Sequence, residues 1–261
     1  MATPQTGAPT DLPARVPDDW YVGFHRGLAA RFWRAAGATM ADDDGRLVRR
    51  LLDAPGGAVL DVPCGDGRLA LRLAAAGYSV IGVDIAAGEL EHARRAAAQA
   101  GVEARFVPGD LRALPDVGPV DAIVSWGNSF GYLTPADTAR SLAGMRSALR
   151  PGGRLILESL TIAESLLVRG IEPRAEWEFG GVRMTAVNRY RAEESRLESD
   201  YLFEDVDGHV ERARAAHHVH TAGELVRLLR AAGFREVSLL GGDGACPYEL
   251  GTPRLIATAS A

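Results

Sequence analysis

The sequence predicts an α/β fold with a doubly wound, mostly parallel sheet of seven strands, and three observations predict it. Short apolar runs alternate with stretches of helical pattern from residue 58 onwards. These runs are nearly continuous in apolar residues, which is typical of strands buried on both faces. Gly77 and Gly101 end the first two helical stretches. Strands and helices in alternation pack as a parallel sheet with helices on both faces.

Each expected element is an apolar or amphipathic run bounded by turn residues. The expected parallel strands are 58–62, 79–84, 103–110, 120–126 and 154–160, and the helices between them are 67–77, 88–101 and 135–153. A last helix, 221–234, begins with Thr221 and carries Glu224 three residues later, as in a capping box. Strands 235–242 and 253–260 follow. The loop between them is too short for a crossover helix, so they should pair antiparallel.

Three segments lie outside this alternation. Residues 1–19 are expected to form a disordered lead-in, because they are rich in Pro, Thr and Ala. They lack the basic start and apolar core of a signal peptide, so a signal peptide is not expected. Residues 20–53 look helical and are dense in aromatic side chains. Residues 176–220 carry three strand-like pieces joined by turns, which predicts an antiparallel β-rich insertion. Residues 20–261 are therefore expected to form one domain.

Composition and charge narrow the function classes. The chain is 47% hydrophobic and 24% charged, as in ordinary globular proteins. Its formal net charge is −5 and its 29 basic residues are all arginine, which argues against nonspecific nucleic-acid binding. No apolar run is long enough to predict a membrane span. The two cysteines form neither a zinc spacing nor a disulfide framework, so a reduced, cytoplasmic protein without a metal is expected.

The turn after the first strand is the strongest candidate for a ligand site. Ligands in open α/β sheets bind beyond the carboxyl ends of the strands. The turn from Pro63 to Gly67 lies there, and its glycines let the backbone approach a ligand closely. Asp84 ends the second strand, where an acid reaches the hydroxyls of an adenosine ribose. A third acid, Asp110, ends the third strand.

The charge of this turn distinguishes between adenosine ligands. A dinucleotide places its pyrophosphate at the helix N-terminus, which Asp66 would oppose. The spacing of the turn, "PCGDGR", also departs from the Gly-x-Gly-x-x-Gly pattern. S-adenosylmethionine has no phosphate and carries a sulfonium and an ammonium group. An acidic turn therefore favours this methyl donor.

Five stretches, in this order, resemble the class I S-adenosylmethionine-dependent methyltransferases: "VLDVPCGDGR", "GVDIAAGELEHAR", "GDLRALP", "DAIVSWGNSFGYL" and "LRPGGRLILE". The resemblance is close over about residues 55–160 and looser over the closing helix and hairpin. The "WGNSFGYL" stretch further resembles bacterial small-molecule methyltransferases, among them amino-sugar N-methyltransferases with a β-rich insertion over the pocket. The resemblance implies a Rossmann-like sheet, S-adenosylmethionine as cofactor, a role in natural-product biosynthesis and an N-terminal helix that lids the site.

The resemblance also assigns roles to individual residues. Asp61 would orient the turn near the amino group of the donor, and the backbone of Pro63, Cys64, Gly65, Asp66 and Gly67 would wrap its methionine half. Asp84 would bind both ribose hydroxyls, with Ile85 against the adenine. Asp110 and the Leu111 backbone would meet the adenine edge, although a helix N-cap is the competing reading of Asp110. Ser125 and Trp126 would face the methionine part. Pro63 replaces the usual first glycine, and Cys64 is expected to be a small filler.

The acceptor half of the site is less well defined by the sequence. A hydroxyl or ammonium acceptor needs a base. In "AHHVHT", a strand would place His218 and His220 on one face and His217 on the other. His218, His220 and Glu158 are therefore the candidate catalytic residues, with a solvent-facing strand as the alternative for the histidines. The further pocket candidates are Tyr21, His25, Trp33, Asn128, Tyr132 and Trp177.

The sequence thus predicts a methyltransferase that acts on N or O of a small molecule, such as a secondary metabolite or sugar. "NSFGY" differs from the Asn-Pro-Pro-Tyr type of motif of nucleobase amino methylases, which argues against DNA as acceptor. An NAD(P)-dependent oxidoreductase and a non-catalytic protein that binds the donor remain as alternatives. An exposed edge of the insertion could pair with a second copy, which would make a homodimer.

Overall fold

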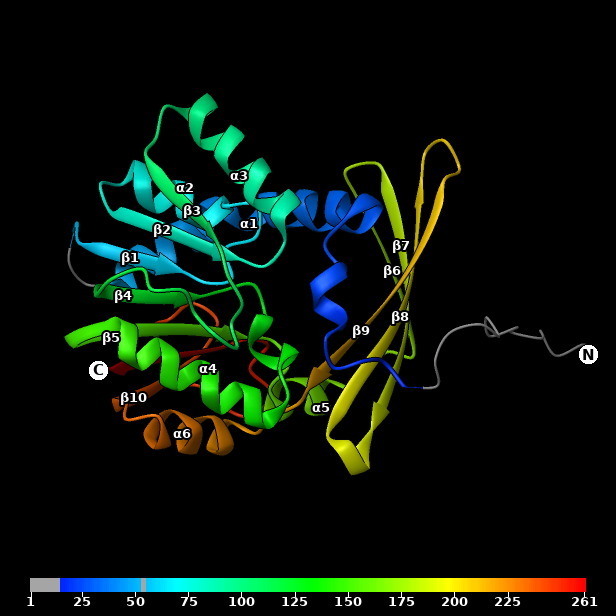
Figure 1. Cartoon of the computed structure of the whole chain (residues 1–261). Helices are drawn as coiled ribbons and strands as arrows, with labels where there is room; N and C mark the ends of the chain where they lie inside the picture. Colours follow the sequence, from blue (N-terminus) through cyan, green and yellow to red (C-terminus); the bar gives the residue numbers. More distant parts are fainter. Residues whose placement is uncertain (1–14, 53–54) are drawn as a thin grey trace, which may run out of the picture.

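The computed structural model describes residues 15–52 and 55–261, and these residues form two sheets (Figure 1). The larger sheet has seven strands in the order β10-β11-β5-β4-β1-β2-β3. Its strands are β1 (Ala58–Asp61), β2 (Ser79–Asp84), β3 (Ala104–Pro108), β4 (Val120–Ser125), β5 (Leu149–Ser159), β10 (Arg235–Leu240) and β11 (Leu255–Ser260). The first five pair in parallel, and β11 pairs antiparallel with both β5 and β10. The predicted doubly wound sheet and its antiparallel closing pair are confirmed.

Helices cover both faces of this sheet. They are α1 (Gly27–Leu52), α2 (Arg68–Ala75), α3 (Ala87–Ala100), α4 (Pro135–Ala148), α5 (Ala163–Arg169) and α6 (Ala222–Ala231). One core cluster joins the sheet to α4 and α6 through Leu142, Met145, Leu225 and Leu229. A second cluster joins the opposite face to α1, α2 and α3. The Thr221 hydroxyl caps α6 by accepting a hydrogen bond from the Glu224 backbone N–H at 3.1 Å, as predicted. Every helix in the described part of the chain is too short or too polar to cross a bilayer.

The segment expected at 176–220 forms the smaller sheet, which stands beside the carboxyl ends of the parallel strands (Figure 1). Its four antiparallel strands are β6 (Arg174–Phe179), β7 (Val182–Arg191), β8 (Arg196–Asp205) and β9 (Val210–His218), with the short 3-10 helix η3 (Ala192–Glu194) before β8. The sequence predicts three pieces rather than four strands. The difference lies at Gly180 and Gly181, whose φ angles of 59° and 67° turn the first piece into a hairpin.

The N-terminal region connects the two sheets. The predicted helical segment 20–53 is a 3-10 helix, η1 (Trp20–Gly23), followed by α1, and residue 53 lies outside the described residues. Gly27, the first residue of α1, has a φ of 55°. The Glu211 carboxylate of β9 accepts a hydrogen bond from the Leu28 backbone N–H at 2.8 Å. Phe32 of α1 packs against the smaller sheet in a third core cluster, whereas Leu47 belongs to the cluster of the larger sheet.

The expected disordered lead-in, 1–19, needs a correction for the part that the structure describes. Residues 1–14 lie outside the described residues. Val16, however, is fully buried. Its backbone carbonyl accepts a hydrogen bond from Arg196 Nη2 at 2.6 Å, and its N–H donates to Glu198 Oε1 at 3.3 Å. Two buried residues at the start of β8, Arg196 and Glu198, therefore hold residues 15–19 through hydrogen bonds to Val16.

Candidate active site

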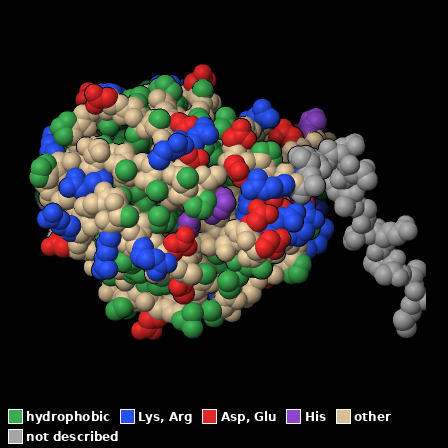
Figure 2. All heavy atoms as spheres, turned by 60° about the horizontal axis from the view of Figure 1, so that its bottom comes forward, with side chains coloured by type: hydrophobic (Ala, Val, Ile, Leu, Met, Phe, Trp, Pro, Cys, Tyr) green, Lys and Arg blue, Asp and Glu red, His purple; other side chains and the backbone are tan. Residues whose placement is uncertain are grey.

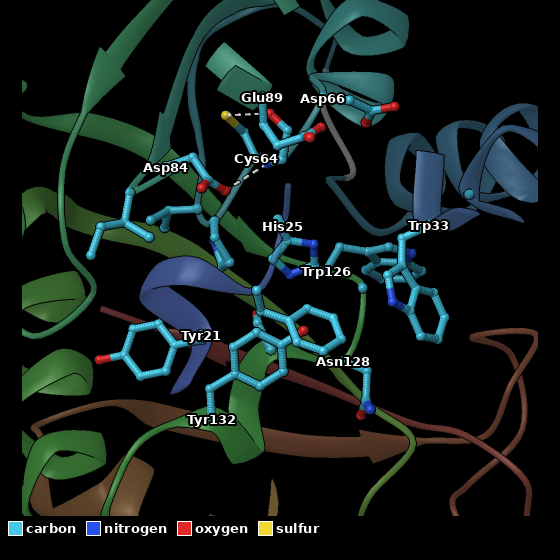
Figure 3. Close-up of a pocket in the computed structure, with 18 of the residues that line it drawn as sticks. Tyr21, His25, Trp33, Cys64, Asp66, Asp84, Glu89, Trp126, Asn128 and Tyr132 are labelled. Atoms are coloured by element: carbon cyan, nitrogen blue, oxygen red, sulfur yellow. Dashed lines mark hydrogen bonds between the residues drawn. The ribbon is translucent and has the colours of Figure 1, made fainter. Parts of the chain in front are cut away.

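A cavity of about 420 Å³ lies at the carboxyl ends of the parallel strands. One side of the cavity is made by the segments that follow β1, β2, β3 and β4, and the other side by η1, α1, η2 (Ser129–Tyr132), β8 and β9. Figure 3 shows the acids of the first side at the top and aromatic rings of the second side at the bottom, with His25 between them. This volume falls within the range of small-molecule sites.

The glycine turn after β1 is held by the neighbouring strand. The Cys64 backbone N–H donates to the Val83 carbonyl at 2.9 Å, and the Gly65 N–H donates to Asp84 Oδ2 at 2.8 Å. Gly65 has a φ of 53° and open space where a side chain would start, which suits close approach of a ligand. Gly67 is needed for packing, because an added Cβ would meet Ala93 at 2.9 Å. Pro63, Cys64, Gly65 and Asp66 line the cavity, and Gly67 does not.

Asp84 lies at the end of β2 with its carboxylate on the cavity wall. Its Oδ2 accepts from Gly65 N–H and its Oδ1 accepts from Ala86 N–H, both at 2.8 Å. Each oxygen of an ionised carboxylate accepts more than one hydrogen bond, so both keep capacity for a ligand hydroxyl. The two backbone donors fix the carboxylate in place. Ile85, the next residue, also lines the cavity, as predicted for an adenine contact.

Asp110 lines the cavity beside Leu111 but shares its carboxylate with a residue that the sequence analysis did not include. Arg112 donates from its backbone N–H at 2.8 Å and from Nη2 at 2.6 Å. Burial acts to raise the pKa of Asp110, but the hydrogen bonds and charge of Arg112 hold it below its usual range. No α-helix begins at Asp110 in the described chain, so the N-cap alternative is not seen there. An adenine amino group would join Arg112 on this carboxylate.

Two further acids lie at or behind this side of the cavity, and burial raises the pKa of both. Asp61 ends β1, is 2% exposed, and lies behind the turn rather than on the cavity wall. Its Oδ2 has no hydrogen-bond partner among the described residues, and burial raises its pKa to about 7. Glu89, in the first turn of α3, lines the cavity and pairs with Arg34 of α1 at 2.7 Å. Burial raises the pKa of Glu89 to about 7 as well.

This acid set fits the predicted donor. The sulfonium and ammonium groups of S-adenosylmethionine would offset the charges of Asp66, Asp84 and Glu89 on the cavity wall and, from a greater distance, that of Asp61 behind the turn. A pyrophosphate would add negative charge to a wall that already holds these acids. The glycine turn and its acids would therefore hold the methionine half, with the ribose at Asp84.

Trp126 and Ser125 lie on opposite sides of strand β4. Trp126 lines the cavity, and the Arg254 guanidinium lies over its ring at 5.5 Å. Ser125 is buried on the other face, beside Leu142 and Met145 of α4, and does not line the cavity in which the methionine part is expected. Successive side chains of a strand point to opposite faces, and only one of the two could reach the cavity. Cys64 lines the cavity, and burial raises the pKa of its thiol, as expected for a filler.

Glu158 reaches the cavity wall, but its carboxylate is already bonded. Its Oε2 accepts from the backbone N–H groups of Gly127 at 2.8 Å and Asn128 at 3.2 Å. Its Oε1 lies 3.5 Å from Arg254 Nη1. Burial raises the pKa of Glu158, and these donors stabilise the ionised form. The geometry suits a residue that positions the loop after β4, and it does not favour the predicted role as a base.

The second side of the cavity is a set of packed rings, which we call the aromatic chamber: Trp20, Tyr21, Phe24, Tyr132, Tyr201 and His217. Tyr21 stacks on Tyr132 with ring centroids 6.0 Å apart, and Trp20 meets Tyr132 edge-on at 4.7 Å. Burial raises the pKa of Tyr21 to about 12. Tyr21 and Tyr132 thus lie where the sequence predicts acceptor contacts, while Trp20, Phe24, Tyr201 and His217 were missed.

Three other residues that the sequence predicts in the acceptor pocket line the cavity outside the aromatic chamber. Trp33 of α1 lines it with 37% of its surface exposed. Asn128 has a φ of 66°, and its Oδ1 accepts from the Leu160 backbone N–H at 2.8 Å. His25 faces Asp84 and Asp66; burial lowers its pKa, and the two acids oppose that shift.

Neither predicted histidine of β9 and its extension lines the cavity. His220 is 2% exposed, its Nδ1 lies 3.1 Å from the Glu224 carboxylate, and its ring packs on Phe130. His218 faces away from the chamber, on the side of Arg196. The sequence placed His217 on the opposite face from His218 but could not show which face meets the cavity. Trp177 of β6 is 46% exposed and also lies outside the cavity.

Known methyltransferases are similar to this chain in sequence. A family model described as a methyltransferase domain matches residues 59–153. The 27-O-demethylrifamycin SV methyltransferase of Amycolatopsis mediterranei is 29% identical over 248 residues, 85% of this chain and 88% of that protein. The demethylmenaquinone methyltransferase of Thermus thermophilus is 40% identical over 102 residues, 38% of this chain. The match covers 45% of that relative's length, so this chain spans less than half of it.

Solved structures share the fold over nearly the whole chain. An S-adenosylmethionine-dependent methyltransferase from Clostridium acetobutylicum superposes with a TM-score of 0.73 at 17% identity, covering 84% of this chain and 89% of that one. An amino pentose methyltransferase from Micromonospora echinaspora, solved with S-adenosylmethionine bound and involved in calicheamicin biosynthesis, gives a TM-score of 0.63 at 24% identity, covering 87% and 94%. The chain thus contains a methyltransferase domain over residues 59–153, and it shares its fold with S-adenosylmethionine-dependent methyltransferases.

Proposed function

We propose that this protein transfers a methyl group from S-adenosylmethionine to a nitrogen or oxygen of a small molecule, a sugar or another natural product. The observation that carries the proposal is the single cavity that joins the acidic glycine turn to the aromatic chamber. The first part suits a cationic adenosine donor, and the second suits a ring-shaped acceptor. The names of the rifamycin and amino pentose methyltransferases support an acceptor of this class.

The acidic side of the cavity would bind the methyl donor, and the aromatic chamber would bind the acceptor. The bound donor supplies an electrophilic methyl group on a sulfonium. Asp84 would bind the ribose, the acids at the turn would balance the positive charges, and Trp126 would contact the methionine part. The chamber rings would orient the acceptor and keep water away from the reacting atoms. Such positioning supplies much of the acceleration of a displacement between two bound groups.

The packing of the chamber fits a ring carrying polar groups. Stacked and edge-on rings of Trp20, Tyr21 and Tyr132 offer flat apolar surfaces with electron-rich faces. Such faces bind the apolar side of a sugar ring and attract an amine in its protonated form. We further propose that the acceptor is a free small molecule in the cytoplasm, since both cysteines, Cys64 and Cys246, are unpaired.

The proposal is tested by calorimetry followed by turnover. S-adenosylmethionine and its demethylated product should both bind to the full chain, and NADH should not. The protein with labelled donor should then methylate members of a panel of methyl glycosides of amino hexoses and matched neutral hexoses. Binding of NADH without binding of either donor form would contradict the donor assignment. Donor binding without transfer to any panel member would contradict the acceptor class.

A further inference from the structure

His217 is the one histidine of the "AHHVHT" stretch whose ring enters the aromatic chamber. It lies on β9, and its ring centroid is 5.2 Å from that of Tyr132 and 5.5 Å from that of Trp20. These two rings come from η2 and η1, so His217 of β9 packs against elements from two other parts of the chain. Ala215, two residues earlier on the same face, also lines the cavity. The side chain of His217 is therefore part of the chamber wall.

The Nδ1 atom of His217 has no hydrogen-bond partner among the described residues, although it is buried. A buried polar atom without a partner costs about 1–3 kcal/mol. His220, by contrast, has the Glu224 carboxylate at its Nδ1. The chamber contributes no carboxylate from η1, η2, β8 or β9, whose cavity-lining residues are Trp20, Tyr21, Ser129, Tyr132, Tyr201, Ala215 and His217. The ring as a whole is only partly buried and lines the cavity, so Nε2 is the nitrogen that a polar group on a molecule in the cavity would meet.

The imidazole of His217 is neutral near pH 7. Burial, together with a smaller effect of the neighbouring His218, lowers its pKa to about 4. The titratable groups around it are the phenols of Tyr21, Tyr132 and Tyr201, and burial raises the pKa of each of them. A neutral imidazole has one nitrogen with a free lone pair, which accepts a hydrogen bond from O–H or N–H. It also has one N–H, which donates to a ring or ether oxygen.

We propose that His217 binds the acceptor by accepting a hydrogen bond from the hydroxyl or amine that becomes methylated, or from its direct neighbour on the same sugar-like ring. This role rests on the proposed function, because it needs an acceptor in the chamber. His217 would point the lone pair of the nucleophile toward the donor side of the cavity. Its effect should appear in the binding and turnover of the acceptor and not in the binding of the donor.

The test compares His217→Phe, His217→Asn and His218→Phe in the full chain. His217→Phe keeps a flat ring and removes both nitrogens, whereas His217→Asn keeps groups that donate and accept hydrogen bonds. His218→Phe makes the same change one residue away, on the face that does not line the cavity. Each variant is assayed for binding of the demethylated product by calorimetry and for kcat and KM with the glycosides methylated by the unchanged protein.

We expect His217→Phe to lower kcat/KM for the acceptor by about tenfold or more, since loss of a hydrogen bond to a buried group has this cost. His217→Asn should recover part of the loss, and His218→Phe should stay within about twofold, as for substitutions away from a site. All three should bind the demethylated product as the unchanged protein does. An unchanged kcat/KM in His217→Phe, with product binding intact, would overturn this role of His217 alone. Donor binding without methylation of any glycoside would overturn the acceptor class and this role together.

Discussion

At the scale of single residues, Asp61 is the acid beside the donor side of the cavity whose charge is least compensated. It is 2% exposed and has an unpaired Oδ2, while the charge of Arg68 acts to lower its pKa. The net result is a pKa of about 7 in the absence of ligand. The folded chain thus binds a proton at Asp61 that the unfolded chain releases at a lower pH. A cationic ligand would remove this cost by pairing with the ionised carboxylate.

This pKa predicts a measurable pH dependence of stability. Because the folded-state pKa is raised from 3.8 to about 7, the contribution of Asp61 is intact below pH 4 and is lost as the pH rises to about 7. Asp61→Asn removes this titration. Between pH 5 and pH 8, the free energy of unfolding of the unchanged protein should therefore fall by about 1–3 kcal/mol more than that of the variant.

Urea unfolding at the two pH values measures this difference. Asp116→Asn is the control, because Asp116 is exposed on the loop before β4 and should leave the pH dependence as it is. Comparing the change with pH within each protein cancels any loss of stability that Asn itself causes. The same pH dependence in the unchanged protein and in Asp61→Asn would contradict the raised pKa.

At the scale of elements, α1 holds the smaller sheet against the rest of the molecule. Phe32 of α1 packs on Phe179 at 5.4 Å and on Phe203 at 5.8 Å, and both Phe32 and Phe203 are almost fully buried. Asp44, further along α1, pairs with Arg68 at 2.7 Å and with Arg254 at 3.2 Å. One end of the helix therefore packs on the smaller sheet and the other end on the larger sheet and α2. The aromatic chamber depends on this connection.

Truncation of Phe203 tests this connection. Phe203→Ala should lower the free energy of unfolding by about 3–5 kcal/mol, because it leaves a cavity between α1 and β8. Val206→Ala, three residues later on a side chain that is 78% exposed, should change it by less than about 0.5 kcal/mol. Chemical unfolding of both variants gives the comparison. A Phe203→Ala loss as small as that of Val206→Ala would show that the interface contributes little.

The sequence predicts the strands of the larger sheet more completely than those of the smaller sheet. The strands of the larger sheet follow from their nearly continuous apolar runs, because strands buried on both faces leave that pattern. The smaller sheet has one face toward α1 and one toward solvent, so its strands alternate between apolar and polar residues instead of forming continuous apolar runs, and the β6–β7 hairpin was missed. The choice between His217 and His218 depends on which face meets η1 and η2. That choice is made by tertiary packing between segments almost 200 residues apart.

At the scale of the whole molecule, the cavity is lined by residues at the carboxyl ends of the larger sheet and by residues of the smaller sheet, and these two sheets stand beside each other in Figure 1. Its donor side could be predicted, because local turns and strand ends position Gly65, Asp84 and Asp110. Its aromatic side could be predicted only in part, because Tyr21 and Tyr132 come from distant segments that meet through α1 and β9. Ser125 is one residue before Trp126 and lies on the face that does not line the cavity.

The surface carries charges of both signs, as expected from a sequence with 29 basic and 34 acidic residues. Figure 2 shows arginines and acids interspersed over one face of the molecule, without a broad patch of a single sign. A protein that binds nucleic acid through its backbone needs a continuous basic surface. The charge that matters for the proposed function lies instead in the cavity, where Asp66, Asp84 and Glu89 face the ligand.

The central claim is that Asp84 holds the ribose of the donor at the acidic glycine turn. Calorimetry of the demethylated donor product with the unchanged protein, Asp84→Ala and the exposed control Asp116→Ala tests it most directly, with thermal melting to confirm that each variant is folded. Loss of a charged hydrogen-bond partner should weaken binding by about tenfold to a hundredfold in Asp84→Ala, and Asp116→Ala should bind within about twofold. A folded Asp84→Ala that binds the product as tightly as the unchanged protein would contradict the account.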